Sequence, residues 1–260
     1  MIRAPVERLA KAYHSRSMGF EGRFGDAVFR YLYYQMRPIV RNFCTTKGSR
    51  TDADINKILW VDPTKIQYDA KLGPSDRGGV YGGCWDWKMS NFKNNYQCRS
   101  LISHFNNGKA WKDTEYYHRQ LRVIERNGEW RGCENEQDLL NFLRKYDDLY
   151  DNLSTDGYKS QRQLKLDSNV VTESDQKTPR YRNEIGVNIG RNGELLWRSN
   201  GRHRLCLAQM LKLDKVAVLV LTRHKQWQAK RNEIKMVSNA NRLSDDVRSY
   251  IEHPDMADIM

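Results

Sequence analysis

The sequence predicts an α+β protein, a small mixed sheet with flanking helices, from three segments. Apolar residues alternate with small or polar ones over residues 185–190, and Asn192-Gly193 is typical of a two-residue hairpin turn before the apolar residues 195–197. Residues 216–221 are apolar throughout, which indicates a buried strand. Residues 134–153 carry Leu and Tyr at spacings of three and four, which indicates a helix. This mixture favours a sheet with helices packed on it.

The N-terminal part is expected to supply a helix, a linker and a first strand. Apolar residues recur near helical spacing over residues 24–43, so we expect an amphipathic helix, interrupted near Pro38. Residues 45–54 are rich in Thr, Ser, Gly and charge, which is typical of a linker. Residues 60–68 have the pattern of a short strand and turn that enter a folded domain.

The middle of the chain combines irregular and helical patterns. Residues 72–98 hold many glycines and aromatics without a clear period, so we expect ordered irregular structure. Helices are expected over residues 101–105 and 114–124, the second capped by Asp113 or Thr114.

Three further segments complete the predicted order of elements. The helix over residues 134–153 is expected to end at Gly157, which can serve as its C-cap. Residues 169–182 are polar and contain a proline, so we expect an exposed insertion loop. The last predicted helix, residues 224–237, carries Lys and Arg beside Trp and Ile.

The most informative motif is Asn200-Gly201-Arg202-His203-Arg204, between the hairpin and an apolar helix. Where a strand gives way to a helix, unpaired backbone N–H groups and the helix dipole favour an anion. Arg202 and Arg204 add forked donors that suit phosphate oxygens, and a neutral His203 can donate to phosphate or act as a general acid. The motif predicts a phosphate pocket; the alternative is an ordinary helix start with exposed arginines.

The charge balance indicates a polyanionic partner. The chain has 44 basic and 32 acidic residues, a formal net charge of +12. An excess of positive charge raises the local concentration of anions. Nucleic acid, a nucleotide and an anionic lipid surface all fit this balance.

Cysteine and histidine usage disfavours several other classes. The five cysteines are widely spaced with no Cys-x-x-Cys pair, which disfavours a disulfide framework or a zinc knuckle. The histidines lack metal-ligand spacing, so no metal site built only from protein groups is expected. We see no signal-peptide pattern and no apolar stretch near the ~18 residues that span a bilayer, so a cytoplasmic protein without a membrane partner is expected.

A helix that ends at Gly157, a polar loop, a hairpin, a Gly-x-His-Arg turn into a helix and a final strand together resemble the ParB/sulfiredoxin-like superfamily. The resemblance covers about residues 147–221, and residues 60–68 are expected to supply the first strand. Within the superfamily the chain looks most like an uncharacterised archaeal and viral group, whose pattern continues as Arg-His-x-x-Trp, here Arg223, His224 and Trp227.

The resemblance implies a domain division and a nucleotide site. The domain would span residues 56–223, with an insertion at about 72–130, a helical extension and linker at 1–55, and a C-terminal helix and tail at 224–260. In ParB proteins the corresponding turn holds the triphosphate of CTP, and in sulfiredoxins and free-serine kinases it holds nucleotide phosphates.

Several residues inherit roles from this resemblance. Gly201 would let the backbone approach the ligand, and His203 and Arg204 would contact phosphate. A loop facing the nucleotide would comprise Gly157, Ser160 and Gln161. Two departures matter: Arg202 stands where sulfiredoxins need a cysteine, which argues against sulfinic acid reduction, and Asn200 stands where many relatives have aspartate, which weakens a kinase interpretation.

The leading functional hypothesis is an NTP-dependent phosphotransferase or nucleotide hydrolase that uses ATP or CTP, with Mg²⁺ arriving on the phosphates. Arg202, His203 and Arg204 would neutralise charge on the transferred group. The alternative is a nucleic-acid-associated protein without catalysis, whose turn and basic helix at 224–237 contact backbone phosphate. A third hypothesis, a viral or mobile-element protein that modifies a metabolite or a base, differs only in substrate.

Other candidates are open between function and packing. Arg223, His224 and Trp227 are expected either to contact substrate or to belong to a packing helix. Acidic residues near the insertion loop and the hairpin are expected to be solvated surface groups rather than catalysts; they are Glu173, Asp175, Glu184 and Glu194.

Overall fold

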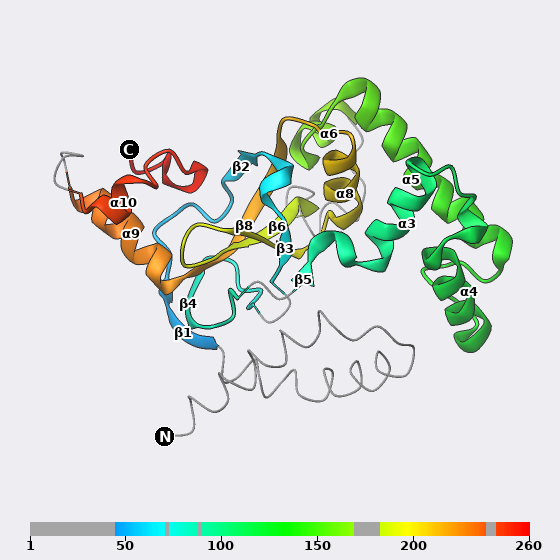
Figure 1. Ribbon diagram of the computed structural model, residues 1–260, viewed down its shortest axis with the longest axis horizontal. Helices are drawn as coiled ribbons and strands as arrows, with labels where there is room; N and C mark the ends of the chain where they lie inside the picture. Colours follow the sequence, from blue (N-terminus) through cyan, green and yellow to red (C-terminus); the bar gives the residue numbers. More distant parts are fainter. Residues whose placement is uncertain (1–44, 71–72, 88–89, 169–182, 238–242) are drawn as a thin grey trace, which may run out of the picture.

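The computed structural model describes residues 45–70, 73–87, 90–168, 183–237 and 243–260 (Figure 1). The helix predicted over residues 24–43 and the insertion loop predicted over residues 169–182 lie outside the described residues.

The described strands form one mixed sheet of eight strands, so the α+β prediction is confirmed. Along the sheet the order is β1-β4-β8-β6-β7-β3-β5, and β2 also pairs with β8. The strands are β1 (Thr45–Arg50), β2 (Ile58–Val61), β3 (Tyr68–Asp69), β4 (Gly79–Gly83), β5 (Ser90–Asn91), β6 (Ile185–Ile189), β7 (Leu195–Ser199) and β8 (Val216–His224).

Strand β8 is the centre of the sheet, and all nine of its residues are buried. It runs parallel to β6 on one side and to β4 on the other, and β2 pairs antiparallel with its first half. A strand that is covered on both faces needs apolar side chains on both, which explains the continuous apolar run at residues 216–221. The strand extends beyond the predicted residue 221, so Arg223 and His224 lie within the sheet rather than after it.

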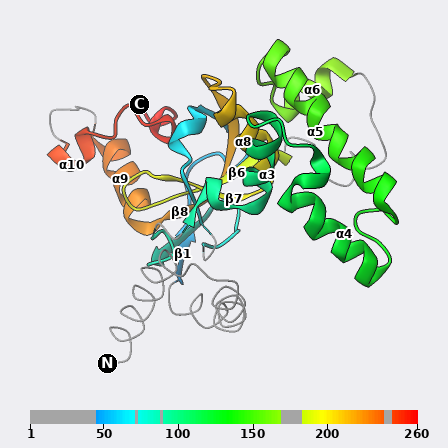
Figure 2. The ribbon, with the colours of Figure 1, turned by 45° about the vertical axis from the view of Figure 1, so that its right-hand side comes forward.

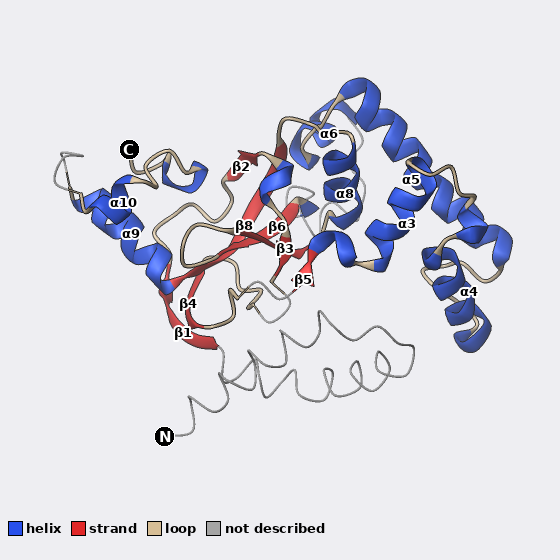
Figure 3. Ribbon diagram, viewed as in Figure 1, coloured by secondary structure: helices blue, strands red, loops and turns tan. Residues whose placement is uncertain are grey.

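Helices lie on two sides of the sheet (Figures 2 and 3). One side carries α3 (Tyr96–Phe105), α4 (Glu115–Asn127), α5 (Glu136–Asp156), α6 (Gln161–Ser168) and α8 (Arg202–Met210). The other carries the C-terminal elements α9 (Lys225–Met236), α10 (Asp245–Arg248) and the short helix η6 (Pro254–Met256). Short helices η1 (Pro63–Lys65), η2 (Phe92–Asn94) and η3 (Trp111–Asp113) lie in the connections.

Side-chain caps explain where the helices begin and end. Thr114 accepts a hydrogen bond from the backbone N–H of Tyr117 and caps α4, as predicted. Asn135 caps α5 in the same way, through the N–H of Asp138. At its other end, α5 stops at Gly157, which has a φ of 72°. These helices pack on each other and on the neighbouring helices α3 and α8, and α8 in turn contacts β6.

Three predictions of local structure were wrong. The expected linker contains β1, because polar residues suit an exposed edge strand and conceal its pairing with β4. The expected irregular segment 72–98 contains β4, β5 and the start of α3. The hairpin turn has three residues, 191–193, because Gly190 pairs with Glu194. The errors at the strands and the turn concern pairing between segments, which local composition does not report.

No helix in the described ranges combines the length and apolar character that crossing a membrane requires.

Candidate phosphate site at the start of helix α8

The turn from β7 into α8 has a left-handed backbone at two successive residues. The φ angles of Asn200 and Gly201 are 52° and 58°. Asn tolerates this conformation better than most residues, and Gly adopts it freely. A Cβ atom on Gly201 would lie 2.6 Å from Cγ1 of Ile185, so close packing on β6 already requires glycine here. Its role in approaching a ligand stays a prediction.

Helix α8 begins without a side-chain cap. The N–H of Leu205 donates to the carbonyl of Gly201, at 2.8 Å, and closes the first helical turn. The earlier N–H groups of any α-helix have no acceptor within the helix. Those of Arg202, His203 and Arg204 therefore form a cluster of donors at the positive end of the helix dipole.

Arg202 and Arg204 lie on different sides of this helix start, each positioned by protein groups. Nη1 of Arg202 donates to Oε1 of Gln97 at 2.5 Å, and its guanidinium lies 4.1 Å from the ring centroid of Trp197. Arg204 donates to the carbonyl of Asn183 and, over 3.4 Å, to the Tyr158 hydroxyl. The two guanidinium groups are thus anchored before any ligand arrives.

His203 is packed into the helical layer. Its ring stacks on Tyr146 at 4.2 Å and on Tyr116 at 5.7 Å between centroids. Burial lowers the pKa of His203 to about 3, helped by nearby arginines, which are Arg202, Arg131 and Arg204. The Nε2 atom is buried with no hydrogen-bond partner among the described residues. His203 is therefore neutral at pH 7 and contributes a hydrogen-bonding group rather than a charge.

Glu184 is a residue of the site that the sequence interpretation placed on the surface, and that interpretation was wrong. Its side chain is completely buried, and burial raises its pKa. Its Oε1 accepts from the N–H of Gln161 at 2.6 Å, and its Oε2 lies 3.5 Å from Nη1 of Arg204. Its position directly before the first apolar residue of β6 was the available signal.

The predicted loop at residues 157–161 does lie beside the turn. Tyr158 and Glu184 connect the two segments, since both contact Arg204. Within the loop, Ser160 Oγ accepts from the N–H of Gln163 at 3.1 Å, and Gln163 Oε1 accepts from the N–H of Ser160 at 2.8 Å. This reciprocal pair is a capping box that starts α6. The structure thus brings both predicted segments together, through two residues that the motif did not include.

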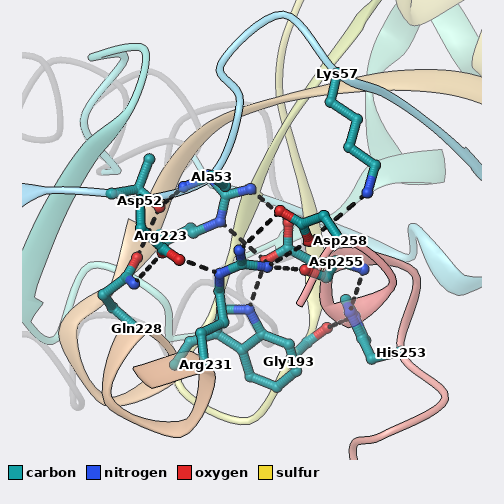
Figure 4. Close-up of polar contacts among 12 residues, drawn as sticks. Asp52, Ala53, Lys57, Gly193, Arg223, Gln228, Arg231, His253, Asp255 and Asp258 are labelled. Atoms are coloured by element: carbon teal, nitrogen blue, oxygen red, sulfur yellow. Dashed lines mark hydrogen bonds and ion pairs between the residues drawn. The ribbon is translucent and has the colours of Figure 1, made fainter. Parts of the chain in front are cut away.

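Arg223 and Trp227 belong to a buried polar cluster around Asp255, and Figure 4 shows Arg223 beside Asp255. Nε of Arg223 and Nε1 of Trp227 each donate to Oδ2 of Asp255, at 2.9 Å. Nε2 of His224 lies 3.2 Å from the carbonyl of Gly83. The cluster fastens the C-terminal segment to β8 and α9, while His224 packs beside Trp85. These contacts agree with the packing alternative for the three residues.

The charges of α9 are largely engaged within the protein. Arg231 is fully buried and pairs with Asp255 and Asp258 (Figure 4). Lys230 pairs with Asp246, and Lys235 lies 3.4 Å from Asp52. The helix therefore offers fewer open cations to nucleic acid than its sequence indicated.

Within the described ranges, no three His, Cys, Asp or Glu side chains gather in a way that could hold a metal ion. Magnesium carried by a nucleotide needs no such group, because it keeps waters and bridges phosphates.

Comparison with known proteins adds no family to this description. No protein-family model matches the chain, and no curated protein or solved structure matches it significantly.

Proposed function

We propose that the protein binds a nucleoside triphosphate, ATP or CTP, through its phosphates at the start of α8, and uses it in phosphoryl transfer or hydrolysis. One observation carries the proposal: an uncapped helix N-terminus carries two arginines, Arg202 and Arg204, that protein contacts already hold in place. The histidine between them, His203, is held neutral because burial lowers its pKa.

The physical case is one of charge and donors. An uncapped N-terminus presents N–H groups and partial positive charge to an anion. Guanidinium groups that protein contacts already hold in place lose little entropy when they bind phosphate. Glu184 provides one opposing charge beside Arg204, and burial favours its neutral form. An incoming phosphate would therefore meet an excess of positive charge.

The chemistry follows from the same groups. Phosphoryl transfer demands neutralisation of charge on the transferred group, which Arg202 and Arg204 can supply. A neutral His203 can contribute a hydrogen bond but no charge at pH 7. Catalysis in this proposal therefore depends more on the arginines than on the histidine.

Calorimetric titration of the protein with ATP and CTP, with and without Mg²⁺, tests the proposal. Arg204→Ala should weaken binding by at least about tenfold, since a hydrogen bond to a charged group contributes about 1.5–3 kcal/mol. Arg122→Ala is the matched control, because Arg122 is an exposed arginine on α4. Binding of no nucleoside triphosphate under any of these conditions would refute the proposal.

The alternative, nucleic-acid binding without catalysis, is favoured by the net charge of +12. It predicts affinity for DNA that falls steeply with added salt. If DNA binds in this way and nucleoside triphosphates do not, the alternative replaces the proposal.

A further inference from the structure

Trp60 is the one aromatic side chain among the exposed large hydrophobic residues of the described chain, with 38% of its surface open to solvent. It lies in β2, where its neighbours Leu59 and Val61 turn into the core. The strand alternation places Trp60 on the opposite face. The Trp60 ring is thus partly exposed to solvent, while Leu59 and Val61 hold the strand in the core.

Trp60 connects to the candidate phosphate site through one side chain. The rings of Trp60 and Tyr158 meet edge to face, with centroids 6.1 Å apart and an interplanar angle of 89°. The hydroxyl of Tyr158 in turn accepts a hydrogen bond from Nη1 of Arg204 at 3.4 Å. Burial raises the pKa of Tyr158 to about 12, so this hydroxyl is protonated at pH 7.

The sheet topology brings the strands at the two ends of this connection close together (Figure 1). Strands β2 and β6 flank β8, with Trp60 opposite Ala217 and Ile185 opposite Val218. The residues that contact Arg204, Asn183 and Glu184, directly precede Ile185. Two strand spacings amount to about 10 Å. A ribose separates a base from its phosphates by a span of the same order.

We propose that Trp60 is the stacking platform for the base of the nucleotide whose phosphates bind at α8, an inference that rests on the proposed function. Base stacking on an aromatic ring contributes about 1–3 kcal/mol and tolerates any base, because every base has a π-face. The ligand is then a nucleotide rather than a simple phosphate or polyphosphate. Trp60 supplies affinity for the base without selecting between purine and pyrimidine.

The test compares nucleotides with a ligand that has no base. Wild-type protein, Trp60→Ala and Trp60→Phe are each titrated calorimetrically with ATP, CTP and inorganic tripolyphosphate. Trp60→Ala should weaken both nucleotides by about 5- to 150-fold and leave tripolyphosphate unchanged. Trp60→Phe keeps an aromatic face and should restore most of the nucleotide affinity. Met236→Ala, at an exposed apolar residue on α9, is the control and should change nothing.

Each contrary outcome identifies what failed. Equal nucleotide affinity in the wild-type protein and Trp60→Ala overturns the stacking role while the phosphate site stands. If Trp60→Ala weakens the binding of tripolyphosphate as much as that of the nucleotides, Trp60 acts through Tyr158 on Arg204 and not on a base. This result also overturns the stacking role. If the wild-type protein binds neither nucleotide nor tripolyphosphate, the proposed function itself fails. Thermal unfolding of every variant checks that the fold is retained.

Discussion

His203 illustrates how packing decides the chemistry of a single residue. In the sequence it stands between two arginines, in a motif that predicts contact with phosphate. In the structure its ring contacts both Tyr116 and Tyr146, and burial is the largest cause of its low pKa. The same stacking fixes the orientation of the ring. We therefore assign its contribution to shape and hydrogen bonding, and the positive charge of the site to the arginines.

A pH dependence of stability follows from His203. Its pKa is about 3 in the folded protein against a usual value of 6.5, so between these values the unfolded chain binds a proton that the folded chain does not. The contribution of His203 to the free energy of unfolding is then fully present above pH 6.5. Below that pH it falls by about 1.4 kcal/mol per pH unit. Urea denaturation at pH 7 and pH 5 should show a loss about 2 kcal/mol larger in the wild type than in His203→Gln.

Two other histidines titrate in the same direction and act as internal controls. Burial also lowers the pKa of His224 and of His253. Both are present in the wild type and in His203→Gln, so their contributions cancel in the comparison. An equal loss of stability in the two proteins would show that His203 is not held neutral.

Among the elements, the C-terminal segment depends on one carboxylate. Asp255 in η6 receives hydrogen bonds from Arg223 on β8 and Trp227 on α9, and it also pairs with Arg231 (Figure 4). All these side chains are buried. A buried ion pair is a weak source of net stability, but removing one partner leaves charge in an apolar environment.

Asp255→Ala should therefore reduce the free energy of unfolding by about 3–5 kcal/mol, because two buried guanidinium groups lose their shared acceptor. Asp246→Ala removes an exposed carboxylate that pairs with Lys230, and it should cost less than about 1 kcal/mol. Urea denaturation of both variants measures the contrast. Similar small losses in the two would mean that the cluster does not hold the segment in place.

Elements with a local signal were predictable from the sequence. The buried strand β8 has a continuous apolar run, and the long helix α5 and the helix that follows the motif have apolar residues at helical spacing. Strand β1 carries no such pattern, since it pairs at an exposed edge with polar residues. The prediction of the hairpin was correct for its two strands. It was wrong for the length of its turn, because that length depends on the pairing of Gly190 with Glu194.

At the scale of the whole molecule, the candidate site depends on distant segments that meet. The motif and the loop at residues 157–161 were selected from the sequence, and the structure places them in contact through Tyr158 and Glu184. Tyr158 has no sequence signature. The position of Glu184 directly before β6 is a weak signal, because its burial arises only when α6 and β6 approach each other. The contact of Trp60 with Tyr158 could not be predicted from the sequence either, because it joins two segments that are far apart in the chain.

The net charge of +12 acts on any anion and so cannot by itself identify a ligand. Two features distinguish the start of α8 from the rest of this basic surface: its uncapped N–H groups and the arginines anchored around it. The start of α4 is a natural contrast, since Thr114 caps it and Glu115 occupies its first turn.

Amide NMR during a titration with tripolyphosphate tests this central claim most directly. The account predicts that the largest chemical-shift changes occur at the backbone amides of Arg202, His203 and Arg204, and that the amides at the start of α4 change little. Unchanged amides at the start of α8, or changes of equal size at the start of α4, would contradict it.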